Sequence, residues 1–378
     1  MNLSQKNQIV ISGTGVWNPP HTITNEELVA SYNQYAEQYN RKHSVAIASG
    51  EMVSKPPSSV RFIEKASGIK SRYVYEKNGI LDIDRMCPKF PERLETEISN
   101  QAEIGVYAAK QAMAAAGKTA SEIDAVIVSC AYTQRAYPAI AIEVQHELGI
   151  KGFAFDMLGA CSAATFGLHR AYEMIMSGSA RCVLAINPEL VTPQVNYCDR
   201  DTHFIFGDVG AAMILEKSDT CTVKNNYAIL GIKAMTHFSS NIRSNFGHIS
   251  RSTDVSPFGC DKLFHQAGRK VFEEVSPVAA EHIRDHLLSL NLKLFDVNRF
   301  WLHQANINMN KMVLRQLFPC EDMNGKAPII LDNYANTASA GSIVAFHFYH
   351  DDLVSGNIGV ICSFGAGYSV GSLILRKQ

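Results

Sequence analysis

Residues 152–164, GFAFDMLGACSAA, contain the turn on which the fold depends. The apolar run at 152–157 predicts a buried strand. The small residues on both sides of Cys161 permit a tight turn from that strand into a helix, and they allow another backbone to approach the thiol closely. The sequence therefore predicts a cysteine held on a sharp strand-to-helix turn.

Two further segments follow apolar runs in the same way. Residues 303–306, HQAN, come after a run at 300–302, and residues 336–339, NTAS, come after a run at 329–331; both runs are predicted strands. A thiol, an imidazole and a carboxamide at strand ends can meet at one point. The thiol supplies a nucleophile, and the other two groups supply hydrogen-bond donors for a developing oxyanion. This trio suits acyl transfer and carbon–carbon bond formation on thioesters.

The two turns also predict an internal duplication. Residues 161–164, CSAA, open a predicted helix, and residues 336–339 open another. Each helix ends in a Ser-Gly pair, at 177–178 and 355–356, and each is followed by a predicted strand. The Cys turn and the Asn turn would then occupy equivalent places, one in each half of the chain.

Strand and helix signals alternate along the whole chain, which predicts a layered α/β fold. The other predicted strands are 9–13, 125–130, 182–187, 211–216, 358–363 and 370–376, the last two as a hairpin. The predicted helices are 25–39 with Thr24 as its cap, 97–116, 140–148, 271–290 with a bend or break at Pro277, 308–318 and one from the Asn turn to Leu353. We divide the chain into an N-terminal half, 1–220, and a C-terminal half, 221–378.

Composition is that of a globular enzyme of more than one core unit. The 378 residues are 46% hydrophobic and 19% charged, with a net charge of −1, so nothing in the charge balance indicates a nucleic-acid partner. The nine cysteines form no CxxC pair, and several lie in apolar strands, as expected of reduced thiols in the cytoplasm. We expect no signal segment and no membrane insertion.

Each of the three central residues also has a simpler interpretation. Cys161 could be an ordinary buried cysteine, but the small-residue turn and its repeat favour a nucleophile whose thiol pKa is lowered at a helix N-terminus. His303 could be satisfied by backbone groups. Asn336 could cap its helix, although a cap uses only the side-chain oxygen and leaves the amide NH2 free to donate.

Other motifs carry less information. Residues 13–15, GTG, follow a strand but open no helix, so a dinucleotide site is not expected. His347, His350, Asp351 and Asp352 have helical spacing that could hold a metal, but a solvated polar face is the better interpretation, and we predict no metal site.

Taken together, these motifs resemble the β-ketoacyl-ACP synthase III family of the thiolase-like superfamily. The match rests on residues 159–164, GACSAA; 303–306, HQAN; 334–339, YANTAS; and 364–368, FGAGY, and it extends nearly end to end. The resemblance implies a five-layer αβαβα fold built from two duplicated halves, and a homodimer. Local stretches such as 135–141, RAYPAIA, look like the subgroup of β-ketodecanoyl-ACP synthases, which are primed by medium-chain acyl-CoA.

The resemblance implies roles for the central residues. Cys161 would be the acylated nucleophile, and His303 and Asn336 would stabilise the enolate formed when malonyl-ACP loses CO2. The backbone N–H groups of Cys161 and Ala366 would form the oxyanion hole. The family usually has Gly at position 366, but Ala retains the N–H group.

The resemblance also places residues around the substrate. Phe206 would line the pantetheine channel, Asn306 would contact the pantetheine arm, and Arg200 would lie at the adenine end of CoA. Tyr137 would reach across the dimer to the partner's acyl pocket. Phe62 stands where the family has Trp over the adenine, and Ala66 replaces an Arg of the same loop, so CoA nucleotide binding is less secure than the core chemistry.

The carrier protein is acidic, so its docking face should be basic. Lys311 and Arg315 are spaced i,i+4 on the helix after HQAN, with Arg269 and Lys270 as weaker candidates. A solvated helix face is the alternative interpretation.

Two insertions, near 31–60 and 76–95, exceed the compact family pattern. Tyr32, Tyr35 and Tyr39 form a stripe in the first one, and the stripe either adds to the core or covers and lengthens the acyl tunnel.

The predicted reaction is a decarboxylating condensation of an acyl-CoA with malonyl-ACP to 3-oxoacyl-ACP, CoA and CO2, with no cofactor. One alternative is an acetyl-CoA-primed synthase of the same type. Another is the condensation of two acyl-CoAs without decarboxylation, which needs a base such as Glu. A third is a paralogue that binds acyl-CoA without turnover.

Overall fold

The computed structural model describes residues 8–244, 259, 262–320 and 324–378. Its strands are β1 (Ile9–Trp17), β2 (His21–Thr24), β3 (Ser71–Val74), β4 (Ala125–Cys130), β5 (Phe153–Leu158), β6 (Cys182–Glu189), β7 (Val209–Lys217), β8 (Tyr227–Ser239), β9 (Ile242–Arg243), β10 (His265–Gln266), β11 (Val297–Leu302), β12 (Ile358–Gly365) and β13 (Gly367–Lys377). Its helices are α1 (Asn25–Lys42), α2 (Ser44–Ala48), α3 (Val60–Ser67), α4 (Asn100–Ala116), α5 (Ile140–Leu148), α6 (Ala163–Met176), α7 (Gly268–Ser289), α8 (Ile307–Leu317), α9 (Leu331–Tyr334) and α10 (Gly341–Phe348).

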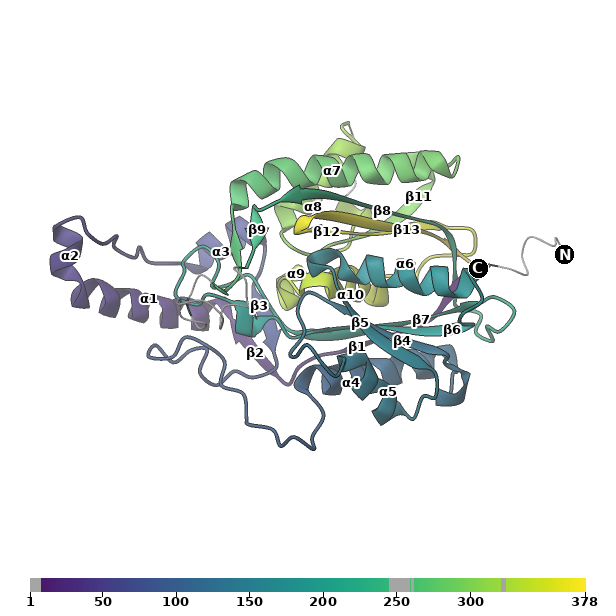
Figure 1. Cartoon of the computed structure of the whole chain (residues 1–378). Helices are drawn as coiled ribbons and strands as arrows, with labels where there is room; N and C mark the ends of the chain where they lie inside the picture. Colours follow the sequence, from purple (N-terminus) through teal and green to yellow (C-terminus); the bar gives the residue numbers. More distant parts are fainter. Residues whose placement is uncertain (1–7, 245–258, 260–261, 321–323) are drawn as a thin grey trace.

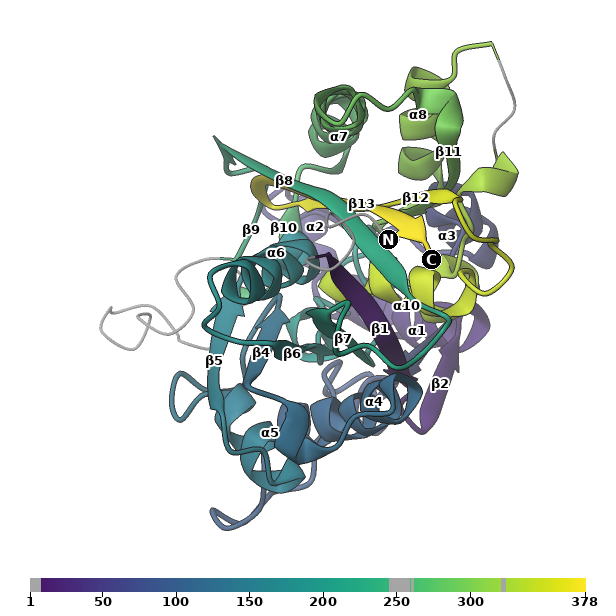
Figure 2. The same ribbon diagram turned by 90° about the vertical axis from the view of Figure 1, so that its right-hand side faces the viewer.

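One hydrogen-bonded sheet runs through the molecule in the order β11-β12-β13-β8-β1-β7-β6-β4-β5. β1 and β8 are joined by only two residue pairs, Val10 with Ala228 and Ile11 with Tyr227. The sheet bends there, so that its two halves face each other across α6 and α10, with α4 and α5 below and α7 and α8 above (Figures 1 and 2). This is the predicted five-layer αβαβα arrangement.

The two halves of the sheet repeat one topology. In the first half, β4 and β6 are parallel, while β6–β7 and β7–β1 are antiparallel. In the second half, β11 and β12 are parallel, while β12–β13 and β13–β8 are antiparallel. The first half has an additional edge strand, β5, parallel to β4. The predicted duplication is therefore present in the fold, and the connection from β7 to β8 separates the two copies.

The predicted strand at 329–331 is wrong, and it is the missing counterpart of β5. The chain passes there without pairing to β11 and then forms the short helix α9. The buried side chain of Gln304 takes over part of the pairing, since its Oε1 accepts from Ile330 N–H at 3.1 Å and its Nε2 donates to Pro328 O at 3.3 Å. The apolar run at 329–331 therefore indicated burial correctly, but the Gln304 amide takes the place of backbone pairing between strands.

Local end signals set several element boundaries as expected. Thr24 and Glu27 form a reciprocal capping box at the start of α1. α4 begins three residues later than predicted because Ser99 caps it, and Gly117 ends it in a left-handed conformation. α5 has its predicted bounds and ends at Gly149 in the same conformation.

Other expectations need correction. α7 is continuous through Pro277, because its packing against α8 and the sheet outweighs the loss of one backbone donor. The last helix ends at Phe348, not at Leu353. The thirteen residues of β8, the small pair β2 and β3, and the helices α2 and α3 were not predicted from the sequence.

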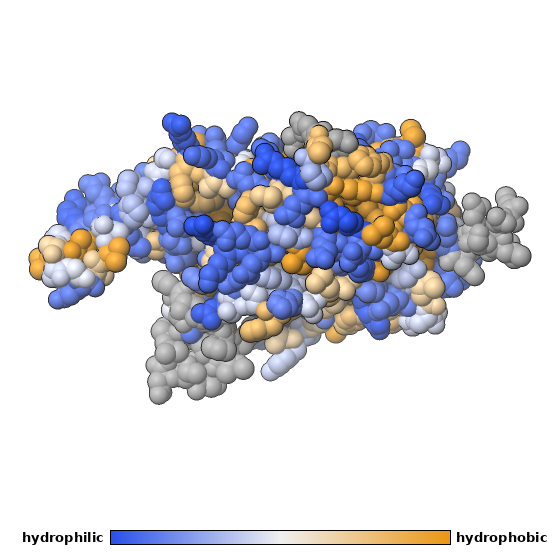
Figure 3. Space-filling view, turned by 90° about the horizontal axis from the view of Figure 1, so that it is seen from above, coloured by the Kyte–Doolittle hydropathy of each residue, from blue (hydrophilic) through white to orange (hydrophobic). Residues whose placement is uncertain are grey.

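The first insertion forms an arm made of α1, α2 and the returning chain, which projects from the body (Figures 1 and 3). Tyr32, Tyr35 and Tyr39 stack in sequence along α1, and Lys55 of the returning chain lies over the second and third rings. Tyr32 also stacks on His203. The stripe therefore adds to the core of its own segment, which is the simpler of the two interpretations.

No helix in the described ranges is long and apolar enough to cross a membrane.

Two buried histidines mark the contact between α7 and the sheet. His282 Nε2 and His286 Nδ1 both lie at hydrogen-bond distance from Ser372 Oγ of β13, at 3.0 and 2.7 Å. Each side chain is about 2% exposed, and burial lowers the pKa of each imidazole to about 4. Both rings are therefore neutral in the folded protein at physiological pH.

This pair predicts a loss of stability in mild acid. In the unfolded chain the two imidazoles take up protons below their usual pKa near 6.5, whereas the folded protein resists protonation down to about pH 4. The unfolded state then binds more protons, so the free energy of unfolding falls as the pH drops from 6.5 to 4, by at most about 1.4 kcal/mol per pH unit for each imidazole. Denaturant unfolding of His286→Leu should give a shallower pH slope in this range than the wild type. His237→Gln, at the exposed end of β8, is the control, and an unchanged slope in His286→Leu would contradict the assignment.

Candidate functional site

Cys161 lies in the turn between β5 and α6, as predicted. The preceding residue, Ala160, has a positive φ of 46°, and the turn forms a single 3-10 turn before the helix starts. Gly365, at the end of β12, packs directly on this turn: a Cβ at Gly365 would lie 2.5 Å from Cys161 Cβ and 3.0 Å from its Sγ. The close approach fixes the thiol against the hairpin of the other half.

Two backbone N–H groups face the thiol. The N–H groups of Cys161 itself and of Ala366 hydrogen-bond to Sγ and favour the thiolate, as expected for an oxyanion hole. The expectation of a lowered thiol pKa is wrong, however. Burial, followed by the negative charge of Glu189, raises the pKa of Cys161 to about 12. Desolvation outweighs the helix N-terminus, although the residue as a whole is only half-buried.

His303 lies one residue beyond β11, where its backbone N–H donates to Cys362 O at 2.8 Å. Its ring packs edge-on against Phe364, with ring centres 5.5 Å apart. The side chain is 2% exposed, and burial lowers its pKa to about 4, so the imidazole is neutral at physiological pH. Nδ1 has no hydrogen-bond partner among the described residues, so no protein hydrogen bond fixes the imidazole through this nitrogen.

Asn336 reaches the site without a preceding strand. It pairs with Phe206 in an isolated parallel bridge, where Asn336 N–H donates to Ile205 O at 2.9 Å and Gly207 N–H donates to Asn336 O at 3.1 Å. Its side-chain Oδ1 accepts from Ala338 N–H at 2.9 Å. This bond closes a local turn and not a helix cap, since α10 begins at Gly341 with Ala340 as its N-cap residue. The capping interpretation is therefore wrong, and the amide NH2 of Asn336 remains as the group that can donate to a ligand.

Contacts between the two halves bring these three residues together. The β12–β13 hairpin touches Cys161 through Gly365 and Ala366 and touches His303 through Phe364. The turn after Asn336 packs against the Cys161 turn. A nucleophile, two backbone donors and two neutral side-chain donors in a water-poor setting form an arrangement suited to acyl transfer through oxyanion intermediates.

A cavity of about 120 Å³ opens at the thiol. The lining residues are Ala131, Ala160, Cys161, Val191, Gln194, Phe206, Ile242, Arg243, Ser244, Phe264, Ala338 and Ala366. Phe206 and Ala366 were predicted here, and none of Tyr32, Tyr35 and Tyr39 lines the cavity. Ala160, Cys161 and Ala338 belong to the two predicted turns. The sequence carried no signal for Ile242, Arg243, Ser244 and Phe264, because they reach the cavity through β9 and the segment before β10, which were not predicted. Among the described lining residues, none carries a carboxylate.

Arg200 and Phe62, both predicted at the adenine end of CoA, lie together. The Arg200 guanidinium carbon is 3.8 Å from the centre of the Phe62 ring, and Arg200 Nε donates to Pro57 O at 2.8 Å. The ring also packs edge-on against Phe204. At this spacing nothing fits between guanidinium and ring, so an adenine would have to stack outside the pair or displace Arg200.

The side chains of Asn306 and Tyr137 do not line the cavity at Cys161. Asn306 caps α8 by accepting from Asn308 N–H, and its Nδ2 donates to Ala66 O at 2.7 Å, so the predicted pantetheine contact would have to share this amide. Tyr137 is 85% exposed on a surface loop and touches no part of the cavity in its own chain.

The predicted docking residues are all exposed. Lys311 and Arg315 lie on α8, which packs against α3. Arg269 and Lys270 lie in the first turn of α7, where Arg269 is paired with Glu273 at 2.9 Å. This ion pair offsets its charge and leaves Lys311 and Arg315 as the stronger candidates.

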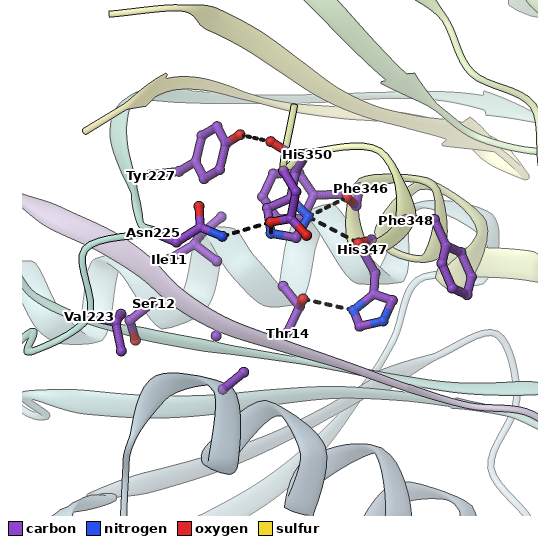
Figure 4. Close-up of a pocket in the computed structure, with 13 residues that line it drawn as sticks. Ile11, Ser12, Thr14, Val223, Asn225, Tyr227, Phe346, His347, Phe348 and His350 are labelled. Carbon is purple, nitrogen blue, oxygen red and sulfur yellow. Dashed lines mark hydrogen bonds and ion pairs between the residues drawn. The ribbon is translucent and has the colours of Figure 1, made fainter. Parts of the chain in front are cut away.

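A second cavity, of about 410 Å³, lies where β1 and β8 meet α10 (Figure 4). Two pairs of its polar groups bond within the protein: His347 Nδ1 with Thr14 Oγ1 at 2.9 Å, and Asp351 with Asn225 at 2.7 Å. His350 faces the carbonyl oxygens of its own helix, and no cluster in the described chain has a metal-binding arrangement. Asp351 and Asp352 are exposed, as the predicted solvated face requires, whereas His347 and His350 are half-buried and support the packing of the helix end.

Comparison with known proteins identifies similar chains. Residues 155–236 match the family model for 3-oxoacyl-[acyl-carrier-protein] synthase III, and residues 287–377 match the model for its C-terminal part. A β-ketodecanoyl-[acyl-carrier-protein] synthase of Pseudomonas aeruginosa is 52% identical over 348 residues, which cover 92% of this chain and 99% of that protein. A β-ketoacyl-[acyl-carrier-protein] synthase III of Granulibacter bethesdensis is 28% identical over 88% of this chain and 95% of its own length.

Solved structures share the fold. The 3-oxoacyl-(acyl carrier protein) synthase III of P. aeruginosa matches with a TM-score of 0.75 at 21% identity, over 98% of both chains. The corresponding enzyme of Aquifex aeolicus matches with a TM-score of 0.74 at 24% identity, over 97% of this chain and 99% of that one.

The contact at Gly365 predicts that a methyl group at this position lowers the reactivity of the Cys161 thiol. Gly365→Ala would place a methyl group inside the contact distance of Cys161 and push the thiol away from its two N–H donors. The rate of Cys161 modification by iodoacetamide, followed by mass spectrometry of the Cys161 peptide, should fall by about tenfold or more. Gly325→Ala, where a methyl group meets nothing within 4 Å, is the matched control. A folded Gly365→Ala protein with a wild-type modification rate would show that this contact does not position the thiol.

Proposed function

The chain belongs to the 3-oxoacyl-ACP synthase III family, and from this premise we propose that it condenses an acyl-CoA with malonyl-ACP. The products are 3-oxoacyl-ACP, CoA and CO2. The chain is thus an acyltransferase of fatty acid biosynthesis. The observation that carries the proposal is that the β12–β13 hairpin contacts both the Cys161 turn and His303, and that the turn after Asn336 packs on the Cys161 turn.

The first half-reaction transfers the acyl group to the enzyme. The Cys161 sulfur attacks the thioester carbon of acyl-CoA, and the resulting oxyanion accepts hydrogen bonds from the N–H groups of Cys161 and Ala366. Collapse of this intermediate breaks the bond to CoA, and the thiol proton leaves with CoA. Because burial raises the pKa of the Cys161 thiol to about 12, the negative charge on sulfur forms only as the substrate is attacked.

The second half-reaction forms the carbon–carbon bond. Malonyl-ACP loses CO2, and the electron pair of the broken bond forms a thioester enolate. The NH2 of Asn336 and the neutral imidazole of His303 donate to the enolate oxygen. The enolate carbon then attacks the Cys161 thioester, and release of Cys161, which regains a proton, gives 3-oxoacyl-ACP. No metal or redox cofactor takes part in this scheme.

The alternatives are less well supported. Condensation of two acyl-CoAs without decarboxylation needs a base to remove an α-proton, and the described residues lining the cavity include no carboxylate. A paralogue that only binds acyl-CoA would need neither a nucleophile facing two N–H donors nor the two side-chain donors beside it.

A medium-chain acyl-CoA, such as octanoyl-CoA, is the proposed primer. The support is the 52% identity with a β-ketodecanoyl-ACP synthase, against 28% with synthases that are named without a chain length. The cavity of one chain, about 120 Å³, is smaller than the about 300–1,000 Å³ of typical ligand sites. A longer acyl chain therefore needs space beyond the described walls of this cavity, and a dimer interface would supply it.

The edge strand β5 supports a homodimer. Its outer edge has no partner in the described chain, and its residues Phe153 and Leu158 are 44% and 59% exposed. Ile142 and Tyr137 nearby are also exposed, so a second copy would cover an apolar face and bring the partner's Tyr137 toward the acyl pocket.

The proposal has two further parts. The acidic carrier protein would dock on the exposed basic residues Lys311 and Arg315 of α8. A cytoplasmic location agrees with the free thiols of all eight described cysteines.

Separate substitutions should divide the two half-reactions. Cys161→Ala should abolish condensation but retain decarboxylation of malonyl-ACP, because it removes only the nucleophile. His303→Ala should still be acylated by acyl-CoA, while decarboxylation falls by about 10²–10³-fold, the loss typical of one oxyanion donor. Release of labelled CO2 and mass spectrometry of the Cys161 peptide measure the two steps. Normal decarboxylation by His303→Ala would show that the donor role is wrongly assigned.

Primer choice should favour a medium chain. Each buried CH2 of an acyl chain gains about 0.8 kcal/mol, so the six additional methylenes of octanoyl over acetyl are worth several kcal/mol before ordering costs. Acylation of Cys161 by octanoyl-CoA should exceed that by acetyl-CoA by about tenfold or more in kcat/KM. An enzyme that prefers acetyl-CoA would contradict medium-chain priming and leave the roles of Cys161, His303 and Asn336 untouched.

A further inference from the structure

Glu189, the last residue of β6, is a fully buried carboxylate behind the candidate active centre. Its Oε1 accepts from the N–H groups of Ser339 and Ala131, both at 3.1 Å, and from the Ser339 hydroxyl. Its Oε2 is 3.2 Å from the same Ala131 N–H. The carboxylate thus holds three donors from two distant segments of the chain.

The three donors belong to the two halves of the site. Ala131 directly follows β4 in the N-terminal half and lines the cavity at Cys161. Ser339 lies in the turn after Asn336 in the C-terminal half, next to Ala338, which lines the same cavity and binds the Asn336 side chain. Glu189 is therefore a direct polar link between the half that carries the nucleophile and the turn that carries the amide donor.

The Glu189 charge also acts on the thiol. After burial, the Glu189 carboxylate is the next cause that raises the pKa of Cys161, and it does the same to the buried Cys130 at the end of β4. Burial raises the pKa of Glu189 itself to about 7, against the hydrogen bonds from Ser339 and Ala131, with a smaller contribution from the buried Asp208. Asp208 is held by different donors, the N–H groups of Tyr75, Val191 and Thr192 and the Thr192 hydroxyl.

We propose that Glu189 is a positioning residue of the condensation: its carboxylate fixes the Asn336 turn against the Cys161 half through the donors of Ser339 and Ala131. This role rests on the function proposed above. Glu189 is not among the described residues that line the cavity, and its carboxylate accepts hydrogen bonds from Ser339 and Ala131. These contacts suit a positioning role.

The two effects separate in two substitutions. Glu189→Gln keeps an oxygen for the Ser339 and Ala131 donors but removes the charge. Glu189→Ala removes both, and leaves three buried donors without an acceptor, so the Asn336 turn is free to shift.

The effect of the Glu189 charge is measured on the Cys161 thiol in the absence of substrate. The pH profile of Cys161 modification by iodoacetamide should move to lower pH by about half a unit or more in Glu189→Gln, because a nearby negative charge no longer opposes the thiolate. Asp208→Asn is the matched control: it neutralises the other carboxyl buried at this end of the sheet and should leave the profile unchanged. An unmoved profile in Glu189→Gln would overturn the charge effect. A shift of equal size in Asp208→Asn would also overturn it, since any buried charge would then suffice.

The positioning effect is read from decarboxylation. In Glu189→Ala, kcat for malonyl-ACP decarboxylation should fall by about ten- to a hundredfold with little change in KM, while acylation by acyl-CoA stays within about threefold. Glu189→Gln should restore most of the rate. If Glu189→Ala does not fold, Ser339→Ala takes its place, with an expected fall of about three- to tenfold in the same step.

Two outcomes would overturn the positioning role: a folded Glu189→Ala or Ser339→Ala that decarboxylates malonyl-ACP at the wild-type rate, or an equal loss of both half-reactions in Glu189→Ala and Glu189→Gln. A wild-type enzyme that does not decarboxylate malonyl-ACP would instead contradict the proposed function. The iodoacetamide profile needs no substrate, and it would still decide whether Glu189 acts on Cys161.

Discussion

The contact between Gly365 and Cys161 is the constraint on which the active centre depends. At this point the hairpin of one half touches the nucleophile turn of the other, with no room for a single methyl group. The contact places the N–H of Ala366 on the sulfur and, through Phe364, sets the position of His303. A glycine is required here for space alone, since the site works only if two backbones meet at van der Waals distance.

The duplicated fold explains why one chain can build such a centre. Both halves end a buried segment in a tight turn before a central helix, and those helices, α6 and α10, lie between the two halves of the sheet (Figures 1 and 2). The copies have diverged at the turn. The first half keeps a full edge strand before Cys161, whereas in the second half Gln304 replaces the strand, and the pairing with Phe206 carries Asn336 into the site.

Burial controls the electrostatics of this centre. Desolvation keeps His303 neutral, raises the pKa of the Cys161 thiol and raises the pKa of Glu189 toward neutrality. A neutral imidazole can still donate one hydrogen bond, and such donors gain strength where water is excluded. The same burial keeps the imidazoles of His282 and His286 neutral. Their protonation in acid therefore favours the unfolded state.

The sequence by itself determined the parts that depend on neighbouring residues. Apolar runs located β4, β5 and β6, the capping residue Thr24 marks the start of α1, and Gly117 and Gly149 mark the ends of α4 and α5. The small-residue turn identified Cys161, and the repeated turn identified Asn336. Only the tertiary structure decided the rest: the Gln304 pairing in place of a strand, the closed stack of Phe62 and Arg200, and the position of Glu189 behind the thiol. Each of these depends on residues between 24 and 150 positions apart. Caps and periodicity act within a few residues, so they carry no information about which distant surfaces will pack together or which buried groups will lose their water.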